Sequence, residues 1–250
     1  MHLTIITGAS RGLGKALAEA LLGPNQLLVC MARSSMASLE TAAARKGCLL
    51  DARTVNLANV NAAVAALANS FSEFDLATIS SATLINNAGT VDPVKPAEKL
   101  RAEEVAASIA LNLATPIALT GAFLRLTAAW KVPRKVLNIS SGAAHSAYHG
   151  WGVYCASKAG LDQFSRCVAL EQQALDDGAR IASLAPGVID TAMQTVLRAV
   201  PAEDFREQAR FVTLKESGAL ASPDDVAKRI VAYLQREDYG QQVVVDLREI

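Results

Sequence analysis

The chain of 250 residues has little cysteine, few aromatic residues and no net charge. Its 24 basic and 24 acidic side chains cancel, whereas nucleic-acid-binding domains usually carry a basic stripe. No run approaches the roughly 20 apolar residues that a membrane span needs, and the N-terminus lacks the basic and apolar regions of a signal peptide. We therefore expect a cytoplasmic protein with neither nucleic acid nor membrane as a partner.

The cysteines also exclude several classes of site. None of the four forms a Cys-x-x-Cys pair or a metal-like cluster with the three histidines, and a chain of this size needs no disulfides. We expect free thiols in a reducing compartment and no metal site. The four cysteines are Cys30, Cys48, Cys155 and Cys167.

Short apolar runs alternate with longer alanine-rich segments along the whole chain. The runs are apolar on both faces, which is typical of parallel strands covered by helices. We expect strands at residues 3–7, 27–32, 83–86, 135–140, 180–185 and 242–246, with a weaker candidate at 53–56. We expect helices at residues 12–22, 36–46, 60–71, 97–130, 153–174 and 223–236. This order predicts a single α/β domain over residues 1–250, a doubly wound parallel sheet (Rossmann fold) of about seven strands with helices on both faces.

The least regular stretch, residues 190–221, is polar and mixed and follows a Pro186-Gly187 turn. A long insertion near the strand ends of such a fold is often a lid over the substrate, and a surface helical pair is the alternative. Ser222 and Pro223 then predict the start of the last helix.

A glycine-rich segment links the first expected strand to the first expected helix, with the spacing G-x-x-x-G-x-G. Glycine allows a sharp turn, a close approach of a phosphate to the backbone and tight packing of the helix on the sheet. The N–H groups at the helix N-terminus favour a pyrophosphate. We expect a dinucleotide here, the alternative being a glycine turn without a ligand. The cofactor-binding candidates of this segment are Gly8, Ser10, Arg11, Gly12, Leu13 and Gly14.

The end of the second expected strand indicates which dinucleotide the chain binds. NAD sites place an acid there to bind the ribose 2′-hydroxyl, but this chain has Arg33 and no acid. Arg33 and Arg11 together would pair with a 2′-phosphate, so NADP(H) is favoured over NAD. Either arginine alone could equally be a solvated surface residue.

A tyrosine and a lysine stand four residues apart on one expected helix. Tyr154 and Lys158 therefore share a helix face. A nearby ammonium favours the phenolate, so we expect Lys158 to lower the pKa of Tyr154 from its ordinary value of about 10. Tyr154 could then pass a proton to a carbonyl oxygen, or remove one in the reverse direction.

These features occur in the order and spacing of the short-chain dehydrogenase/reductase family, which the chain resembles over nearly its whole length. The motifs that carry the resemblance are residues 7–14, Asn86-Asn87-Ala88-Gly89, Asn112, Ser140-Ser141, Tyr154-x-x-x-Lys158 and Pro186-Gly187. The resemblance implies a catalytic set of Asn112, Ser141, Tyr154 and Lys158.

The resemblance also implies a role for each of these residues. Ser141 would orient and polarise the substrate carbonyl, with Ser140 as the alternative if the register is shifted. Lys158 would also hold the nicotinamide ribose hydroxyls. Asn112 would kink its helix and join a water-linked proton relay with Lys158, the alternative being a satisfied core asparagine.

Further cofactor contacts follow from the same resemblance. Residues after the fourth expected strand would border the adenosine ribose, and the segment with the pattern P-G-x-x-x-T would hold the nicotinamide carboxamide. The family commonly has an aspartate near the adenine amine, where this chain has an asparagine, whose amide can still accept that hydrogen bond. These residues are Asn87, Ala88, Gly89, Pro186, Gly187, Ile189, Thr191 and, in place of the aspartate, Asn56.

Within the family, five stretches resemble sepiapterin reductases and, more strongly, bacterial benzil reductases that form (S)-benzoin. They are residues 84–99, 130–142, 150–160, 185–194 and 210–220. The resemblance implies an NADPH-dependent carbonyl reductase acting on a small-molecule ketone. The preferred substrates are a vicinal diketone such as benzil, reduced to benzoin, or a sepiapterin-like side-chain ketone.

The candidate substrate contacts are Ser141, Trp151, Met193 and Asp246. Phe205 and Phe211 could add to an adaptable lid. Core packing is the alternative for the apolar ones, and an ion pair or solvation for Asp246.

Two other functions stay open. The chain could be an NADP-dependent alcohol dehydrogenase on another substrate. A non-catalytic, NADPH-binding regulatory protein is disfavoured, because all four members of the catalytic set are present. The resemblance also implies a homodimer through residues 97–130 and 153–174, with a tetramer as the alternative.

Overall fold

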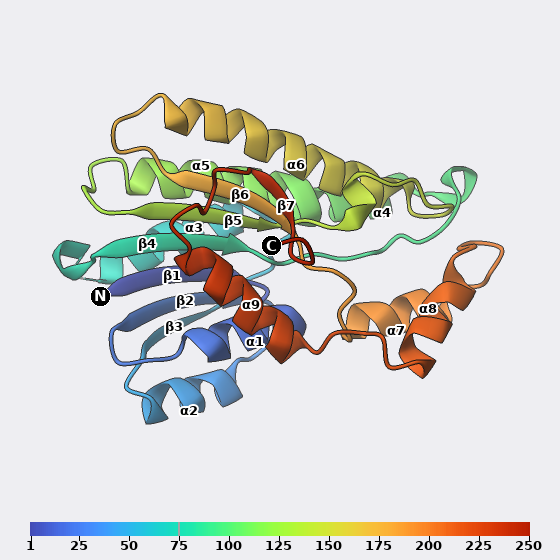
Figure 1. Cartoon of the computed structure of the whole chain (residues 1–250), viewed down its shortest axis with the longest axis horizontal. Helices are drawn as coiled ribbons and strands as arrows, with labels where there is room; N and C mark the ends of the chain where they lie inside the picture. The colour runs from blue at the N-terminus through green and yellow to red at the C-terminus, as the bar shows by residue number, and fades with distance from the viewer. Residues whose placement is uncertain (75) are drawn as a thin grey trace.

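The structure is a computed structural model that describes residues 1–74 and 76–250. At its centre, the described residues form one seven-stranded parallel sheet in the order β3-β2-β1-β4-β5-β6-β7 (Figure 1). The sheet grows outward in both directions from the β1–β4 pair, so the predicted doubly wound class is confirmed. The strands are β1 (His2–Thr7), β2 (Gln26–Ala32), β3 (Leu49–Thr54), β4 (Ser81–Asn86), β5 (Arg134–Ile139), β6 (Arg180–Ala185) and β7 (Val244–Asp246).

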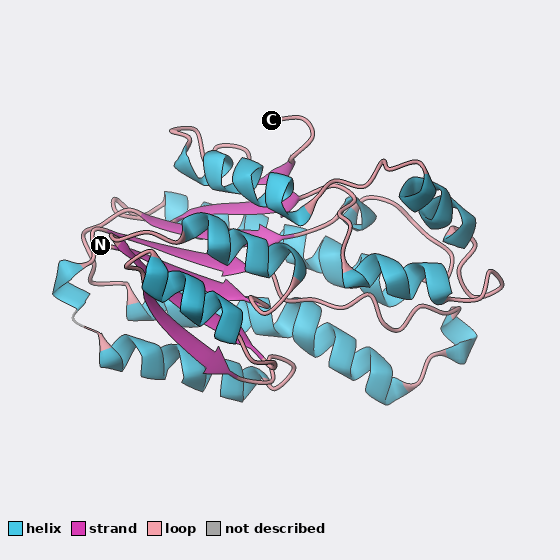
Figure 2. Cartoon of the chain, turned by 90° about the horizontal axis from the view of Figure 1, so that it is seen from below, coloured by secondary structure: helices cyan, strands magenta, loops and turns pink. Residues whose placement is uncertain are grey.

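Helices cover both faces of the sheet (Figures 1 and 2). One core packs α1, α2 and α9 on one face, and a second packs α3, α5 and α6 on the other. The helices are α1 (Gly12–Leu21), α2 (Ala37–Arg45), α3 (Val60–Glu73), α4 (Ala102–Ile109), α5 (Thr115–Leu126), α6 (Gly152–Gln173), α7 (Ala192–Ala199), α8 (Gln208–Glu216) and α9 (Pro223–Gln235). The short helical turns are η1 (Leu76–Thr78), η2 (Ala97–Lys99), η3 (Ala110–Ala114) and η4 (Gly142–Ala144).

The continuous apolar runs follow from this double coverage. In β2, Leu28 and Cys30 point into the core with α1 and α9, whereas Val29 and Met31 point into the core with α3 and α5. Successive strand residues face opposite sides, so a strand buried on both sides has no polar alternation.

Several element boundaries differ from the prediction. The helix expected over residues 97–130 is divided into η2, α4, the π-helical turn η3 and α5, because Arg101 is extended at the start of α4 and Asn112 sits in the π turn. Strand β3 ends at Thr54 rather than reaching residue 56, so Asn56 lies in the turn that follows. Strand β7 begins at Val244 rather than at residue 242.

Residues 190–221 contain α7 and α8, so they are more regular than the preferred expectation and contain the helical pair that was its alternative. These helices lie beyond the carboxyl ends of the strands (Figures 1 and 2). A β-bridge between Ile189 and Ala221 closes the base of the segment, where Asp190 N donates to Ala221 O at 2.9 Å. At the start of α9, the Ser222 hydroxyl accepts from Asp225 N at 3.1 Å, which confirms the predicted cap.

The run Ala102–Leu126 corrects the expectation that no segment is long and apolar enough to cross a membrane. This helical run is long and apolar enough to cross a membrane by length and composition alone. In the fold, 44% of its most apolar window is buried. It carries the buried polar residues Asn112, Thr115 and Thr120, and α5 packs on α3 and α6. Its place in the fold is that of a core helix beside the sheet.

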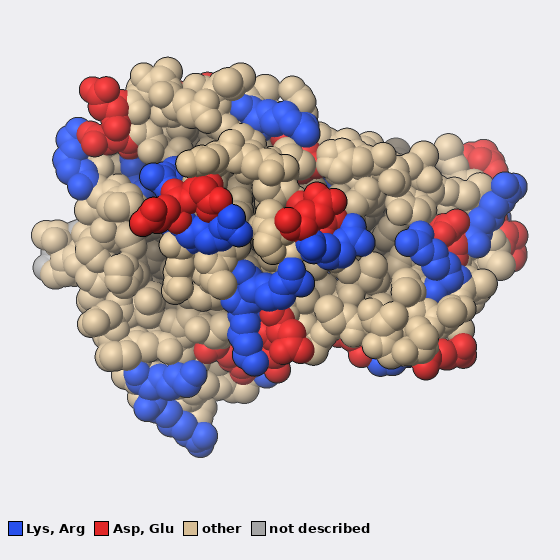
Figure 3. Space-filling view, viewed as in Figure 1, with Lys and Arg blue, Asp and Glu red and all other residues tan. Residues whose placement is uncertain are grey.

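Charges of both signs are scattered over the face shown in Figure 3, and no field of one sign covers that face. This pattern agrees with the formal net charge of +0.

Candidate functional site

A cavity of about 1490 Å³ opens at the carboxyl ends of the strands, where α7 and α8 overhang the sheet. Its walls come from segments far apart in the sequence: the loops after β1, β2, β4, β5 and β6, the start of α6, and α7. All the predicted cofactor and substrate residues line this cavity, as do Ser141, Tyr154 and Lys158. Asn112 does not line it and lies behind its wall.

The glycine loop has the close packing that its spacing predicts. Gly8 and Gly12 have positive φ angles of 73° and 55°, which favour glycine. A Cβ on Gly14 would stand 2.3 Å from Gly8 O and 2.4 Å from Asn87 Nδ2. The loop therefore admits no side chain at Gly14, and its backbone stays accessible to a ligand in the cavity.

Hydrogen bonds tie this loop to the segment after β4. Thr7 Oγ1 accepts from Asn87 N at 2.9 Å and from Ala88 N at 3.0 Å, and Asn87 Nδ2 donates to Thr7 O at 3.0 Å. The glycine loop and the segment after β4 are thus joined by hydrogen bonds between side chains and backbone at neighbouring strand ends.

Arg11 and Arg33 are exposed and both line the cavity. Neither arginine takes part in an ion pair among the described residues, so both guanidinium groups are available to an anion. Asn56 is exposed nearby, and its Oδ1 accepts from Ala58 N at 3.1 Å, which fixes the turn after β3.

Ser141, Tyr154 and Lys158 meet where β5 ends and α6 begins. Ser141 hydrogen-bonds Tyr154, and its Oγ also accepts from Ala143 N at 3.2 Å. Lys158 Nζ lies 5.7 Å from the centroid of the Tyr154 ring and donates to Ile139 O at 2.8 Å. The neighbouring Ser140 hydroxyl is buried and has no hydrogen-bond partner in the described part of the chain. The geometry therefore joins Ser141, rather than Ser140, to Tyr154.

The protonation of this group differs from the prediction. Burial raises the pKa of Tyr154 to about 12, and the hydrogen bond from Ser141 only partly opposes that shift. The expected lowering by Lys158 is not found: the ammonium lies 5.7 Å from the ring centroid and donates to Ile139 O, and burial dominates the pKa of Tyr154. Burial also lowers the pKa of Lys158 to about 8, against an opposing pull from Asp162. At neutral pH, Tyr154 is a protonated phenol and thus a proton donor.

Asn112 is a fully buried residue of the π turn η3, and both ends of its amide are engaged. Its Oδ1 accepts from Thr90 N and its Nδ2 donates to Thr90 O, each at 2.8 Å. π turns are frequent at functional sites because they displace one residue from the helix register. Here the turn fastens the helix to the loop after Gly89, beside Lys158.

An aromatic wall borders Tyr154. The Trp151 ring stacks on the Tyr154 ring, with centroids 4.7 Å apart and planes inclined at 21°. Phe205 and Phe211 meet Trp151 edge-on at 5.5 and 6.0 Å. Phe205 is fully buried, as core packing predicts, whereas Phe211 and Met193 line the cavity.

Asp246 lines the cavity with its carboxylate already paired. Arg248 Nε donates to Asp246 Oδ1 at 2.9 Å and Nη2 donates to Oδ2 at 2.5 Å. This pairing lowers the pKa of Asp246 below its ordinary value. The ion pair that the sequence left open as the alternative is the one the structure shows.

Three further residues of the site were not predicted. Gln194 in α7 is buried, lines the cavity, and its Oε1 has no partner among the described residues. Arg210 in α8 hydrogen-bonds Tyr148, and both line the cavity. The sequence signal for Gln194 was weak, because a glutamine on an irregular segment is usually solvated.

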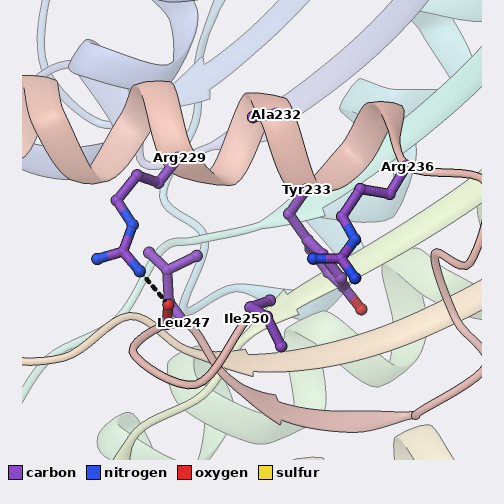
Figure 4. Close-up of a pocket in the computed structure, with 6 residues that line it drawn as sticks. All are labelled: Arg229, Ala232, Tyr233, Arg236, Leu247 and Ile250. Atoms are coloured by element: carbon purple, nitrogen blue, oxygen red, sulfur yellow. Dashed lines mark hydrogen bonds between the residues drawn. The ribbon is translucent and has the colours of Figure 1, made fainter.

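A second, smaller cavity of about 180 Å³ lies between α9 and the C-terminal residues and shares no lining residue with the large one. Arg229 and Arg236 flank it (Figure 4). Arg229 donates to Leu247 O and Arg236 pairs with Asp238, so both guanidinium groups are already engaged. The predicted chemistry belongs to the large cavity.

Comparisons with known proteins agree with this geometry. Residues 2–201 match the family model described as short chain dehydrogenase. Benzil reductase ((S)-benzoin forming) of Bacillus cereus is 39% identical over 249 residues, covering 100% of both chains, and sepiapterin reductase of Rattus norvegicus is 31% identical, covering 98% of this chain and 96% of its own. The crystal structure of the KRED1-Pglu enzyme superposes with a TM-score of 0.84 at 27% identity, covering 97% of this chain and 99% of its own. The chain is therefore an oxidoreductase that belongs to the short-chain dehydrogenase/reductase family.

Proposed function

We propose that the protein reduces a ketone that stands beside a second carbonyl, with benzil as the model substrate and NADPH as the reductant. The observation that carries this proposal is the protonated Tyr154, hydrogen-bonded to Ser141 and stacked on Trp151 in one large cavity. The full-length similarity to a benzil reductase supports the choice of substrate.

The cavity fits a nicotinamide dinucleotide. Its glycine loop has no room for a side chain at Gly14, and the Thr191 methyl lies 3.4 Å from where a Cβ on Gly12 would stand, so the two predicted cofactor segments face each other. We assign the pyrophosphate to residues 8–14, the 2′-phosphate to Arg11 and Arg33, and the nicotinamide end to Ile189 and Thr191. When bound, the reduced nicotinamide supplies the hydride.

The residues of this chain supply the proton and the orientation. The ketone oxygen would accept hydrogen bonds from Ser141 and Tyr154, which polarise the carbonyl and fix its face. Tyr154 would give its proton to the oxygen as the carbonyl carbon is reduced. Lys158 would hold the ribose hydroxyls and stabilise the phenolate that Tyr154 becomes.

The aromatic wall favours a flat, apolar substrate. Trp151 and Phe211 offer ring faces and edges beside the reacting carbonyl, where an aryl ketone would pack in stacked or edge-on geometry. We propose that α7 and α8, which carry Met193 and Phe211, form a lid over this substrate.

The test is to mix the purified protein with benzil and NADPH, and to follow loss of the reduced-nicotinamide absorbance beside a parallel reaction with NADH. Rapid loss with NADPH and slow loss with NADH is the expected result, and chiral chromatography would then resolve the benzoin formed. If neither cofactor is oxidised with benzil or with sepiapterin, the diketone proposal fails.

The homodimer and the cytoplasmic location remain predictions. Ile117 of α5 and Leu170 of α6 are 37% and 70% exposed, which suits a homodimer through these helices, and light scattering would measure its mass. All four cysteines are free thiols, which agrees with a reducing, cytoplasmic compartment.

A further inference from the structure

A buried carboxylate that the mechanism above does not use lies directly behind the catalytic lysine. Asp162 follows Lys158 by one turn of α6 and is only 1% exposed. Residues four apart on a helix are neighbours on the same face. A buried charge is costly unless it is compensated, so the surroundings of Asp162 indicate what it does.

The two oxygens of Asp162 have different surroundings. Oδ1 accepts from the Ser183 hydroxyl of β6 at 2.6 Å. Oδ2 accepts no hydrogen bond from the described residues, and His145 Nε2 lies 3.2 Å away, within ion-pair distance. The His145 side chain is 55% exposed and lines the cavity, so it separates the carboxylate from solvent.

Lys158 is as enclosed as Asp162, at 4% exposed. Its ammonium meets the neutral Tyr154 ring on its own helix, the Ile139 carbonyl from β5, and the uncharged Asn112 and Gly89 segment from the opposite wall. Among the described residues, Asp162 is the carboxylate whose charge opposes the effect of burial on Lys158. His145 is the titratable group that faces Asp162 from a neighbouring element.

We propose that Asp162 is a positioning residue that keeps Lys158 in its charged form inside the wall of the active site, with Ser183 and His145 holding the carboxylate in place. This inference rests on the proposed function for the role of Lys158. The arrangement gives a buried lysine a local counter-charge without exposing it to water, so that it stays cationic where it contacts the ribose and Tyr154.

The test measures the lysine itself, without substrate or cofactor. Lysine labelled with carbon-13 at Cε is incorporated, and the Lys158 signal, assigned by its loss in Lys158→Arg, is titrated with pH. The wild-type midpoint is expected near pH 8. Asp162→Asn should lower it by about one pH unit, since the carboxylate one helical turn away favours the charged lysine. Glu171→Gln, which removes an exposed carboxylate from the same helix, is the matched control and should leave the midpoint unchanged. An unchanged midpoint in folded Asp162→Asn overturns the proposal.

If Asp162→Asn does not fold, a second pair of variants tests the same proposal. His145→Arg places a fixed cation beside Asp162 on an exposed side chain and should lower the Lys158 midpoint, whereas His145→Gln should not. Equal midpoints in these two variants contradict the proposal. Because the titration needs no turnover, it separates this inference from the substrate proposal, which the benzil assay tests alone.

Discussion

The two sides of the cavity are built differently. On the sheet side, Gly14 has no space for a side chain, and the side chains of Thr7 and Asn87 hydrogen-bond the backbone of the neighbouring strand end. On the lid side, α7 and α8 pack on Trp151 through apolar side chains such as Leu197 and Phe211. The ion pairs Lys215–Asp190 and Lys99–Asp204 lie nearer the surface, where such pairs contribute little to stability.

The difference separates the chemistry from the choice of substrate. In the proposed function, the sheet edge holds the cofactor and the proton donor, so changes there should alter the rate or the choice of cofactor. The helices α7 and α8 contact the site through side chains, among them Met193 and Phe211, so changes there should alter which ketone is accepted. The predictions below test this division from the largest expected effect to the smallest.

Removing the proton donor should have the largest effect. Tyr154→Phe keeps the ring that stacks on Trp151 and removes the hydroxyl, so the turnover number should fall about 10²–10⁴-fold. NADPH affinity, measured by fluorescence titration, should stay within about twofold of wild type. Activity close to wild type would remove Tyr154 from the proton-donor role.

Replacing the buried lysine should separate stability from activity. The folded pKa of Lys158, about 8, lies below its ordinary value of 10.5. Between these values the unfolded chain holds the proton and the folded chain does not, so the contribution of Lys158 to the free energy of unfolding rises with pH across this window. Below pH 8 the full cost of burying the charge is present.

Lys158→Met should therefore raise the free energy of unfolding below pH 8 by about 1–3 kcal/mol while strongly reducing turnover. The gain should vanish above about pH 10.5, where the lysine is neutral in both states. Urea denaturation of wild type and Lys158→Met at several pH values measures this difference in the free energy of unfolding. A variant that is less stable than wild type at pH 7 contradicts the pKa assignment.

Changing the cofactor end should alter selectivity without altering the chemistry. Arg33→Asp places a carboxylate where the 2′-phosphate is assigned, so the ratio of kcat/KM for NADPH over NADH should fall about tenfold or more. Arg45→Asp, a change of the same charge at an exposed position of α2, is the control. An unchanged ratio in Arg33→Asp would remove Arg33 from the phosphate site.

Changing the lid should have the smallest effect on the rate. Phe211→Ala removes a ring that meets Trp151 edge-on, so KM for benzil should rise about three- to tenfold with little change in kcat. The KM of a small aliphatic diketone should change less. Equal losses for both substrates would place Phe211 in the rigid part of the site.

The sequence predicted the sheet side of the cavity far better than the lid side. Gly8, Tyr154 and Lys158 lie at the ends of strongly apolar strands or on a long helix, where local pattern and topology fix position together. Residues 190–221 were expected to be an irregular lid, with a helical pair only as the alternative. α8 has almost no apolar periodicity, and α7, although amphipathic, is only 8 residues long.

Burial was the other quantity that the sequence could not supply. The rise in the pKa of Tyr154 comes from enclosure by Trp151 and the cavity wall, and spacing alone indicated only the nearby lysine. Asp162 was missed for the same reason, since its proximity to Lys158 matters only because both are buried.

The most direct test of the account follows the hydride into the product. Benzil is reduced with NADPH carrying deuterium at the reactive carbon of the nicotinamide ring, once on each face, and the benzoin is analysed by NMR. The account predicts deuterium on the carbinol carbon from one face only, and little product from Tyr154→Phe. Benzoin without deuterium from either face, or equal product from wild type and Tyr154→Phe, would contradict hydride transfer at this site.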